Sequence, residues 1–471
     1  MAPSSTARGD RTAIWPRGAR CEQAAYSPAV KAAGWVFVSG RNAAEPGVGV
    51  PDEARVDPES PFLGSQLDLE SRHVLSGLAA TLREAGCDLR HDVVRIYQWL
   101  PSPHPTAEEF EQGSSTTGIP VYHYNRALDD FQGFPRPAST AMGVRRLLPA
   151  GTHIETDLIA MEPEPGRILR SFDFPDDLPQ PTSKYSPALR CGDWIFIAGD
   201  LPTDFRGDFL SDRHLGEPSG LAPEARVNPY FWHGSSMAAQ VDYTLAKLER
   251  LAEVAGSSLA RCVKAYVYIG HPQDLAELDR AWRRWFPTNP PARVVIPFMG
   301  LAVRGARIEI ALTLLADDST LSIQTIEAAA APEPVGPAPQ AVRAGSFLFF
   351  SGLLPIDARG RLASETRAHP AFPFEVQPAK LQIRYQLRNA AAICSAAGTS
   401  LANICRRQAF HDDLRHYAPV MEEWQAHFPV DPPASTTVEV GGPLLVPGVH
   451  TLLDLIGYVP GDPPRRVAGL R

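Results

Sequence analysis

Two stretches of this chain are nearly the same: YSPAVKAAGWVFVSG at 26–40 and YSPALRCGDWIFIAG at 185–199. A third stretch, APQAVRAGSFLFFSG at 338–352, follows the same pattern with fewer identities. Each ends in an aromatic and β-branched run typical of a buried strand, preceded by a Gly that suits a tight turn. The copies are about 155 residues apart, far more than the roughly 20–50 residues of a solenoid unit. The chain is therefore predicted to contain one domain three times.

Other landmarks recur in the same order in each copy. A helical pattern ends at Gly86, Gly256 and Gly398, as expected where Gly follows a last helical turn. An alternating stretch typical of a strand follows each of these glycines: VVRIYQWL, CVKAYVYI and ICRRQAF. Each copy then closes with a Pro-Ala segment and two strands. The predicted order is strand, strand, helix, strand, helix, strand, strand.

Pro-rich stretches separate the copies. These are MEPEPG at 161–166 and IEAAAAPEPVGPAP at 326–339, and such composition favours extended linkers. The predicted modules are residues 1–165, 166–328 and 329–471.

Two insertions distinguish the copies. The second copy carries DFRGDFLSDRHLGEPSG at 204–220, and the first carries PSPHPTAEEFEQGSSTTGIPVYHYN at 101–125. Long loops of this composition serve either as functional lids or as tolerated decoration.

Composition restricts the function classes. The net charge of −8 and the pI near 5.9 disfavour a nucleic-acid surface, which requires a basic stripe. No apolar run reaches the ~18 residues of a membrane span, and the first residues lack a secretory h-region, so we expect a cytoplasmic protein. The six cysteines form no CxxC pair, and HExxH, Walker and GxGxxG motifs are missing from the sequence. We therefore expect neither a metal nor a cofactor.

The ordered set of YSPAV…SG, AGSSL, a helix ending in WF, PAR and IEIA resembles the Rid/YjgF family of reactive-intermediate deaminases. The resemblance covers nearly the whole chain and implies an α+β fold like that of the small chorismate mutases. Members of the family are usually homotrimers with clefts between protomers. Three tandem Rid/YjgF modules would form an intramolecular pseudo-trimer, either monomeric or in a low-order homo-oligomer.

The resemblance also implies an activity, the hydrolysis of amino-acid-derived enamines and imines to keto acids and ammonia without a cofactor. An Arg in the PAR motif would hold the carboxylate of a small-molecule substrate, because a guanidinium offers a planar bidentate fork. A nearby carboxyl group and a water would protonate and hydrate the C=N bond.

The second copy matches the family's catalytic set best. It has Arg293 in PARVV, Glu309 in RIEIA and the pocket tyrosine Tyr185, which we expect to converge in one cleft. Ala198 stands where family members usually have Ser, which weakens one pocket hydrogen bond. The alternatives are a structural ion pair for Arg293, a solvated face for Glu309 and a core rim for Tyr185.

The first copy keeps a partial set for substrate binding: Tyr26, Ser39, Asn125 and Glu155. It has Ser139 at the position of the guanidinium. Candidates to replace the missing guanidinium are Arg136, Arg145 and Arg146, and the insertion contributes His123 as a further candidate acid or base.

The third copy has lost most of the set, with Ala338, Ser435 and Leu452 in place of Tyr, Arg and Glu, and it keeps Ser351. All three copies keep a Glu-x-Arg motif at Glu53/Arg55, Glu224/Arg226 and Glu365/Arg367. Because even the third copy keeps it, we interpret this motif as a source of salt bridges between modules.

Three functions remain open from the sequence. The first is deamination of a small enamine or imine carboxylate. The second is a specialised biosynthetic enzyme of the same fold, chorismatase-like or tailoring an imine or enamine intermediate. The third is a non-catalytic metabolite-binding or scaffold protein.

Overall fold

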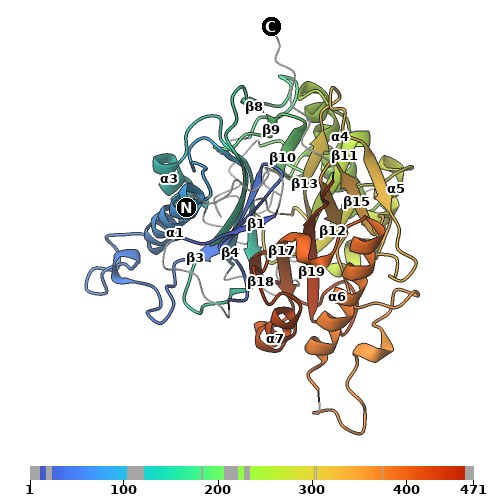
Figure 1. Ribbon diagram of the computed structural model, residues 1–471. Helices are drawn as coiled ribbons and strands as arrows, with labels where there is room; N and C mark the ends of the chain where they lie inside the picture. Colours follow the sequence, from blue (N-terminus) through green and yellow to red (C-terminus); the bar gives the residue numbers. More distant parts are fainter. Residues whose placement is uncertain are drawn as a thin grey trace, which may run out of the picture.

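A computed structural model describes residues 11–16, 24–102, 121–181, 184–205, 221–227, 234–301, 303, 305–374 and 376–461. Within these residues the strands form three sheets, and two longer helices accompany each sheet. The helices lie on the outside of the molecule and the sheets face one another at its centre (Figure 1). The two large insertions lie mostly outside the described residues, so their role stays a prediction.

The first sheet has the strand order β1-β2-β3-β7-β4-β5. Its strands are β1 (Thr12–Ile14), β2 (Ala29–Ala32), β3 (Trp35–Asn42), β7 (Glu155–Met161), β4 (Val93–Pro101) and β5 (Ala138–Val144), and its helices are α1 (Gln66–Glu84) and α3 (Val121–Phe131). Only the β4–β5 pair is parallel; the other pairs are antiparallel.

The second sheet repeats this order as β8-β9-β10-β13-β11-β12. Its strands are β8 (Leu169–Phe172), β9 (Ala188–Cys191), β10 (Trp194–Asp200), β13 (Ile308–Leu315), β11 (Cys262–Ile269) and β12 (Ala292–Pro297), and its helices are α4 (Ser236–Val254) and α5 (Leu275–Trp285).

The third sheet has the order β14-β15-β16-β19-β17-β18-β6. Its strands are β14 (Ile323–Ile326), β15 (Ala341–Ala344), β16 (Phe347–Phe350), β19 (Thr451–Tyr458), β17 (Ile404–His411), β18 (Ala434–Glu439) and β6 (Arg146–Leu147), and its helices are α6 (Pro378–Ala396) and α7 (Tyr417–His427). The edge strand β6 comes from the first third of the chain, so the chain that follows β5 crosses over to the third sheet.

The predicted element order is confirmed, with one addition. The first helix of each copy stops two residues before its glycine, and Gly86, Gly256 and Gly398 all have φ of +79°, a backbone conformation that favours Gly. Sequence reasoning missed a short outer strand before each copy: β1, β8 and β14. These strands have three or four residues, too few to show an alternating pattern.

Each sheet buries one face against its own helices. Along β13, Ile308, Ile310 and Leu312 face the helices, and Glu309 and Ala311 face the opposite way, because successive side chains of a strand alternate. This alternation directs some polar residues of each sheet toward the neighbouring sheets.

Aromatic side chains of all three sheets meet at the centre. The Trp35 ring lies 4.9 Å from Trp194 and 4.7 Å from Phe347, measured between centroids. The three come from the equivalent strands β3, β10 and β16. These strands contain the repeated runs WVFVSG, WIFIAG and FLFFSG. The stretch that identifies the repeat therefore also builds the common core.

A buried basic residue reaches from each sheet to the next. Arg95 donates to the carbonyls of Ile197 and Leu312 in the second sheet. Lys264 of the second sheet pairs with Asp454 of the third. The third basic residue, Arg406 on β17, pairs with Asp157 of the first sheet at 2.5 Å. Because Arg95, Lys264 and Arg406 are at equivalent register positions, the contacts run in a closed ring from sheet to sheet.

The expected role of the Glu-x-Arg motif is wrong for the contacts that the structure describes. Arg226 and Arg367 donate to carbonyls five residues earlier, those of Leu221 and Leu362, and Glu365 pairs with Arg388 of α6 in its own copy. The contacts described for Arg226, Arg367 and Glu365 are therefore local and shape the turn before the first helix of their own copy.

Candidate functional site at the seam between the first and third sheets

One strand of each sheet, the one paired in parallel (β5, β12 or β18), packs on the next sheet and forms a seam. Seam 1–3 is where β18 meets the first sheet, and the backbone N–H of Ser435 donates to Ser39 Oγ at 2.8 Å. Seam 1–2 is where β5 meets the second sheet, and Gly199 N donates to Thr140 Oγ1 at 3.2 Å. In seam 2–3 the N–H of Arg293 on β12 donates to Ser351 Oγ at 3.0 Å.

Glu155 occupies seam 1–3 on the face of β7 that points away from the helices. A Cβ added to Gly40 would overlap its carboxyl group and would lie 3.1 Å from Thr436 Oγ1 of the third sheet, so Gly40 makes room for the acid. Burial raises the pKa of Glu155 to about 8, Asp157 adds to the rise, and hydrogen bonds from Asn42 and the Thr437 backbone oppose it. The acid is therefore protonated at neutral pH and able to donate a proton.

Two tyrosines lie near this acid, Tyr26 ahead of β2 in the first copy and Tyr417 at the start of α7 in the third. Burial raises the pKa of Tyr26, and the nearby Tyr417 and Glu155 add to the rise. Burial also raises the pKa of Tyr417, which Arg407 lowers and Glu155 raises. Tyr417 of α7 thus lies within electrostatic range of both a guanidinium and the acid.

Arg407 on β17 supplies that guanidinium. Its side chain is fully buried and stacks on Trp424, with the guanidinium carbon 4.6 Å from the ring centroid. Nη1 donates to Ser435 Oγ at 2.9 Å and lies 3.3 Å from Met421 Sδ, and Nε and Nη2 have no hydrogen-bond partner among the residues that the structure describes. Burial lowers the pKa of Arg407 to about 10, so it still carries its charge at neutral pH.

Arg407 matches Arg293 in place but not in partner. Arg293 lies 5.2 Å from the centroid of Trp282 and pairs with Asp279 at 2.6 Å. Counted back from the ends of α5 and α7, Trp282 corresponds to Trp424, and Asp279 to Met421. The second copy therefore neutralises its guanidinium with a carboxylate, and the third copy offers only a thioether.

Sequence reasoning missed Arg407 because it looked for an Arg in the Pro-Ala motif. The register pairs Arg407 with Ser435, as it pairs Ala265 with Arg293. The second copy therefore carries its guanidinium on β12, and the third copy carries it on the neighbouring strand β17, at the paired position. Two adjacent arginines in ICRRQAF, a strand with burial at every position, are the signal that could have indicated it.

Seam 1–2 contains the second buried acid, Glu309, in a different environment. Burial raises the pKa of Glu309 to about 8, and Asp200 adds to the rise. Tyr185 is near, because after burial the carboxylates of Asp200 and Glu309 contribute to its raised pKa. Arg136 lies at this seam, because its carbonyl accepts a hydrogen bond from Ser186 of the second copy. Its guanidinium is paired with Asp129 at 2.7 Å.

Seam 2–3 lacks the acid and the tyrosine, since Leu452 and Ala338 stand at those positions. A Cβ added to Gly336 of the preceding linker would overlap Arg293 Nη2, so this linker lies directly over the guanidinium. The Arg293 side chain has no exposed surface.

The expectation that Arg293, Glu309 and Tyr185 converge in one cleft is wrong. Arg293 faces the helices and its backbone joins the third sheet, whereas Glu309 lies beside Gly199 and Thr140 at the first sheet. The physical reason is that β12 and β13 present these residues on opposite faces, with β11 between the two strands. An Arg and an acid from one copy therefore serve two different seams.

The remaining sequence candidates divide between the seams and the surface. The Ser39 hydroxyl donates to Ser27 O and accepts from Ser435 N, so both of its roles are used within the protein. Ser139 donates to Gln98. Asn125 lies half-buried on α3. Ala198 cannot make the bond that Ser39 makes, in agreement with the expected loss.

Two of the proposed substitutes for the missing Arg are excluded by their contacts. Arg145 and Arg146 both pair with Glu439 of β18, at 3.3 and 2.7 Å, and thereby hold β6 on the third sheet. His123 is half-buried on α3. His411 is the buried last residue of β17.

The sequence pattern of the family described as endoribonuclease L-PSP matches residues 176–315 and 328–450. The match covers more than half of the chain, so the chain belongs to this family, the one that the Rid/YjgF resemblance indicated. That resemblance is confirmed.

Individual relatives each correspond to a part of the chain. A RutC family protein of Pyrococcus horikoshii is 34% identical over 111 residues, 23% of this chain and 79% of its own length. A 2-iminobutanoate/2-iminopropanoate deaminase of Salmonella typhimurium is 32% identical over 106 residues, 22% of this chain and 73% of its own. The crystal structure of Escherichia coli TdcF with bound serine is 27% identical, covers 29% of this chain and 98% of that one, and gives a TM-score of 0.24.

No helix in the described part of the chain is both long and apolar enough to cross a membrane.

Proposed function

We propose that this chain hydrolyses a small carboxylate-bearing enamine or imine to a carbonyl product and ammonia at seam 1–3. The observation that carries the proposal is a buried guanidinium without an acidic partner, Arg407, in the same seam as the protonated acid Glu155. A relative named for the deamination of 2-iminobutanoate and 2-iminopropanoate supports the reaction class.

Each group in the seam has a step to perform. Arg407 binds the substrate carboxylate, which supplies the counter-charge that Met421 does not. Glu155 gives its proton to the imine nitrogen, or to the β-carbon of an enamine to form the imine. Water then adds to the protonated imine and one of the water protons passes to the amine nitrogen, and the carbinolamine expels ammonia as its remaining hydroxyl proton returns to the Glu155 carboxylate.

The proposal extends to the architecture. We propose that residues 1–165, 166–328 and 329–471 are three modules that stand in for the protomers of a trimer. The closed ring of contacts through Arg95, Lys264 and Arg406 supports this arrangement. Fusion would free two of the three seams to diverge while one keeps the chemistry.

The test is the decay of freshly generated 2-imino acids, produced by an amino-acid oxidase and followed by semicarbazide trapping and ammonia release. Wild type should accelerate loss of the imine. Arg407→Ala and Glu155→Gln should each lower kcat/KM by about 100-fold or more, because each removes a group that touches the substrate.

The equivalent groups of the other seams are matched controls. Arg293→Ala and Glu309→Gln should leave kcat/KM within a few-fold of wild type. If these two variants lose activity and the seam 1–3 variants keep it, the assignment to seam 1–3 is wrong. If wild type does not exceed the uncatalysed rate, small-imine deamination is excluded, and the specialised-enzyme and binding hypotheses remain.

A further inference from the structure

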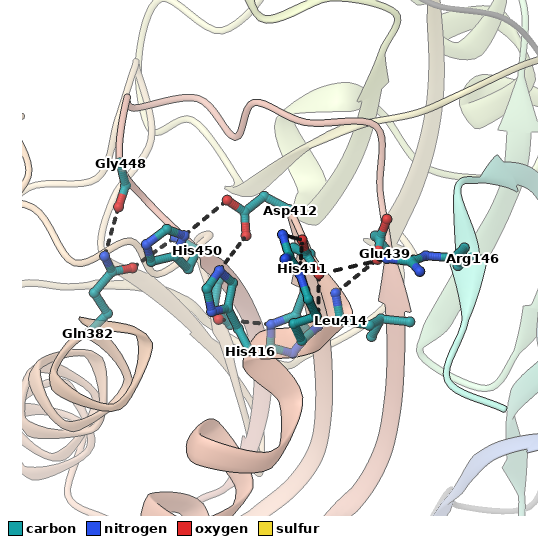
Figure 2. Close-up of polar contacts among 12 residues, drawn as sticks. Arg146, Gln382, His411, Asp412, Leu414, His416, Glu439, Gly448 and His450 are labelled. Atoms are coloured by element: carbon teal, nitrogen blue, oxygen red, sulfur yellow. Dashed lines mark hydrogen bonds and ion pairs between the residues drawn. The ribbon is translucent and has the colours of Figure 1, made fainter. Parts of the chain in front are cut away.

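A cluster of two histidines and an aspartate lies at the end of the third sheet, outside the three seams. Asp412 follows the last residue of β17, His416 immediately precedes α7, and His450 immediately precedes β19. Figure 2 shows the Asp412 carboxylate between the two imidazoles, with an interaction drawn to each. Three segments distant in sequence thus bring ligand-type side chains to one point.

The geometry suits a small cation. His450 Nδ1 lies 3.0 Å from Asp412 Oδ2, and His416 Nε2 lies 3.8 Å from Asp412 Oδ1. One ligand atom from each residue lies within 4.8 Å of the other two. Ligands bound at about 2.0–2.2 Å in a tetrahedron are about 3.3–3.6 Å apart, so small side-chain rotations close the set. The side chains remain 23–25% exposed, which leaves a path for an ion and a water.

The supporting framework holds the ligands in place. Gln382 of α6 donates to the Gly448 carbonyl at 2.7 Å and accepts from the His450 N–H at 2.8 Å, which fixes the loop before β19. His416 is held by its N–H bond to the Asp413 carbonyl. Preorganised ligands of this kind are what a metal site requires.

The second sheet provides a built-in comparison at the same place. There Gln240 fixes the corresponding loop through Gly305 and Arg307. Arg307 pairs with Asp274 at 2.9 Å, and these residues occupy the positions of His450 and His416 relative to the flanking elements. Gly270 stands where the third copy has Asp412. An ion pair in one copy is therefore replaced in the other by three metal-ligating residue types.

We propose that Asp412, His416 and His450 form a binding site for a divalent transition-metal ion of the zinc class. Two imidazoles and one carboxylate suit Zn²⁺, Ni²⁺, Cu²⁺ or Fe²⁺ and not Mg²⁺ or Ca²⁺, which prefer oxygen ligands. Three protein ligands leave a coordination position for water. The ion would join β17, α7 and β19, and would fix the first turn of the helix that carries Tyr417 and Trp424.

The experiment measures metal binding by tag-free full-length protein stripped with a chelator. Zn²⁺ is titrated by competition with a chromogenic chelator, and Co²⁺ by its visible absorption. The key variant is the double change His416→Asp with His450→Arg, which restores the ion pair that Asp274 and Arg307 form in the second copy and therefore should fold. We expect wild type to bind one ion per chain at least 100-fold more tightly than this variant.

A second variant separates binding from folding. Asp412→Gly, the residue at the equivalent position of the second copy, should weaken Zn²⁺ binding by tenfold or more without changing the far-ultraviolet circular dichroism of the metal-free protein. Zn²⁺ should raise the thermal midpoint of wild type and of neither variant. Equal affinity of wild type and the double variant would overturn the proposal, as would a wild-type preference for Mg²⁺ or Ca²⁺.

Discussion

Arg407 and Arg293 occupy corresponding places, but their substitution should change stability in opposite directions. Arg407→Met removes a buried charge that has no acidic partner, so the free energy of unfolding should rise by about 1–3 kcal/mol. Arg293→Met leaves Asp279 unpaired and should lower it by about 1–3 kcal/mol, less than for a fully buried pair because Asp279 keeps some contact with water. Urea unfolding of the two variants and wild type measures both changes. A loss of stability in both would contradict the view that Arg407 awaits an external anion.

Glu155 should make both activity and stability depend on pH. Its folded pKa of about 8 lies above the ordinary value of 4.5 for a glutamate, so the folded state holds more protons than the unfolded state between these values. The free energy of unfolding should therefore fall as pH rises from about 4.5 through 8. The reaction rate should also fall above about pH 8, as the acid loses its proton.

Glu309 provides the comparison, because its pKa is raised to about 8 as well. Glu155→Gln and Glu309→Gln should each flatten the slope of stability against pH. Only Glu155→Gln should abolish the hydrolysis of 2-imino acids. A pH–rate profile with no loss near pH 8 in wild type would argue against Glu155 as the proton donor.

At the scale of the strand, a glycine beside each acid decides whether the acid fits. A Cβ at Gly40 would overlap the Glu155 carboxyl group, and one at Gly199 would overlap that of Glu309. Both alanine variants should lose about 1–3 kcal/mol of stability through local overpacking. Gly40→Ala should in addition lower kcat at least tenfold by displacing the acid, while Gly199→Ala keeps its kcat. Equal kcat in the two variants would show that neither acid acts in the rate-limiting step.

The elements themselves were largely predictable from sequence. The strand runs alternate, and the first helix of each copy stops at a Gly with positive φ, so local physics fixes both kinds of element. The short outer strands were missed because their pairing comes from the neighbouring hairpin, as β1 with β2. The site residues stay a prediction: Glu155 and Tyr26 lie near each other at seam 1–3, whereas Arg293, which the sequence grouped with Glu309, lies at another seam.

At the scale of the whole molecule, the three sheets share one central core. Trp35 contacts Trp194 and Phe347 from the other two sheets and is 1% exposed. Trp35→Ala should lower the free energy of unfolding by about 3–5 kcal/mol. The loss should appear in one transition for the whole chain, seen at the same denaturant concentration by tryptophan fluorescence and by circular dichroism. Separate transitions would mean that the copies fold independently of the shared core.

The sequence by itself determined the repeat, the family, the order of strands and helices and the residue types available for chemistry, because these depend on local patterns along the chain. Only the tertiary structure decided which residues meet. Strand alternation places Arg293 and Glu309 on opposite faces of one sheet, and packing of β18 on the first sheet brings Ser435, the partner of Arg407, to the first sheet, where Glu155 lies. A site assembled from two copies depends on how sheets pack across hundreds of residues, and no pattern within one copy encodes that contact.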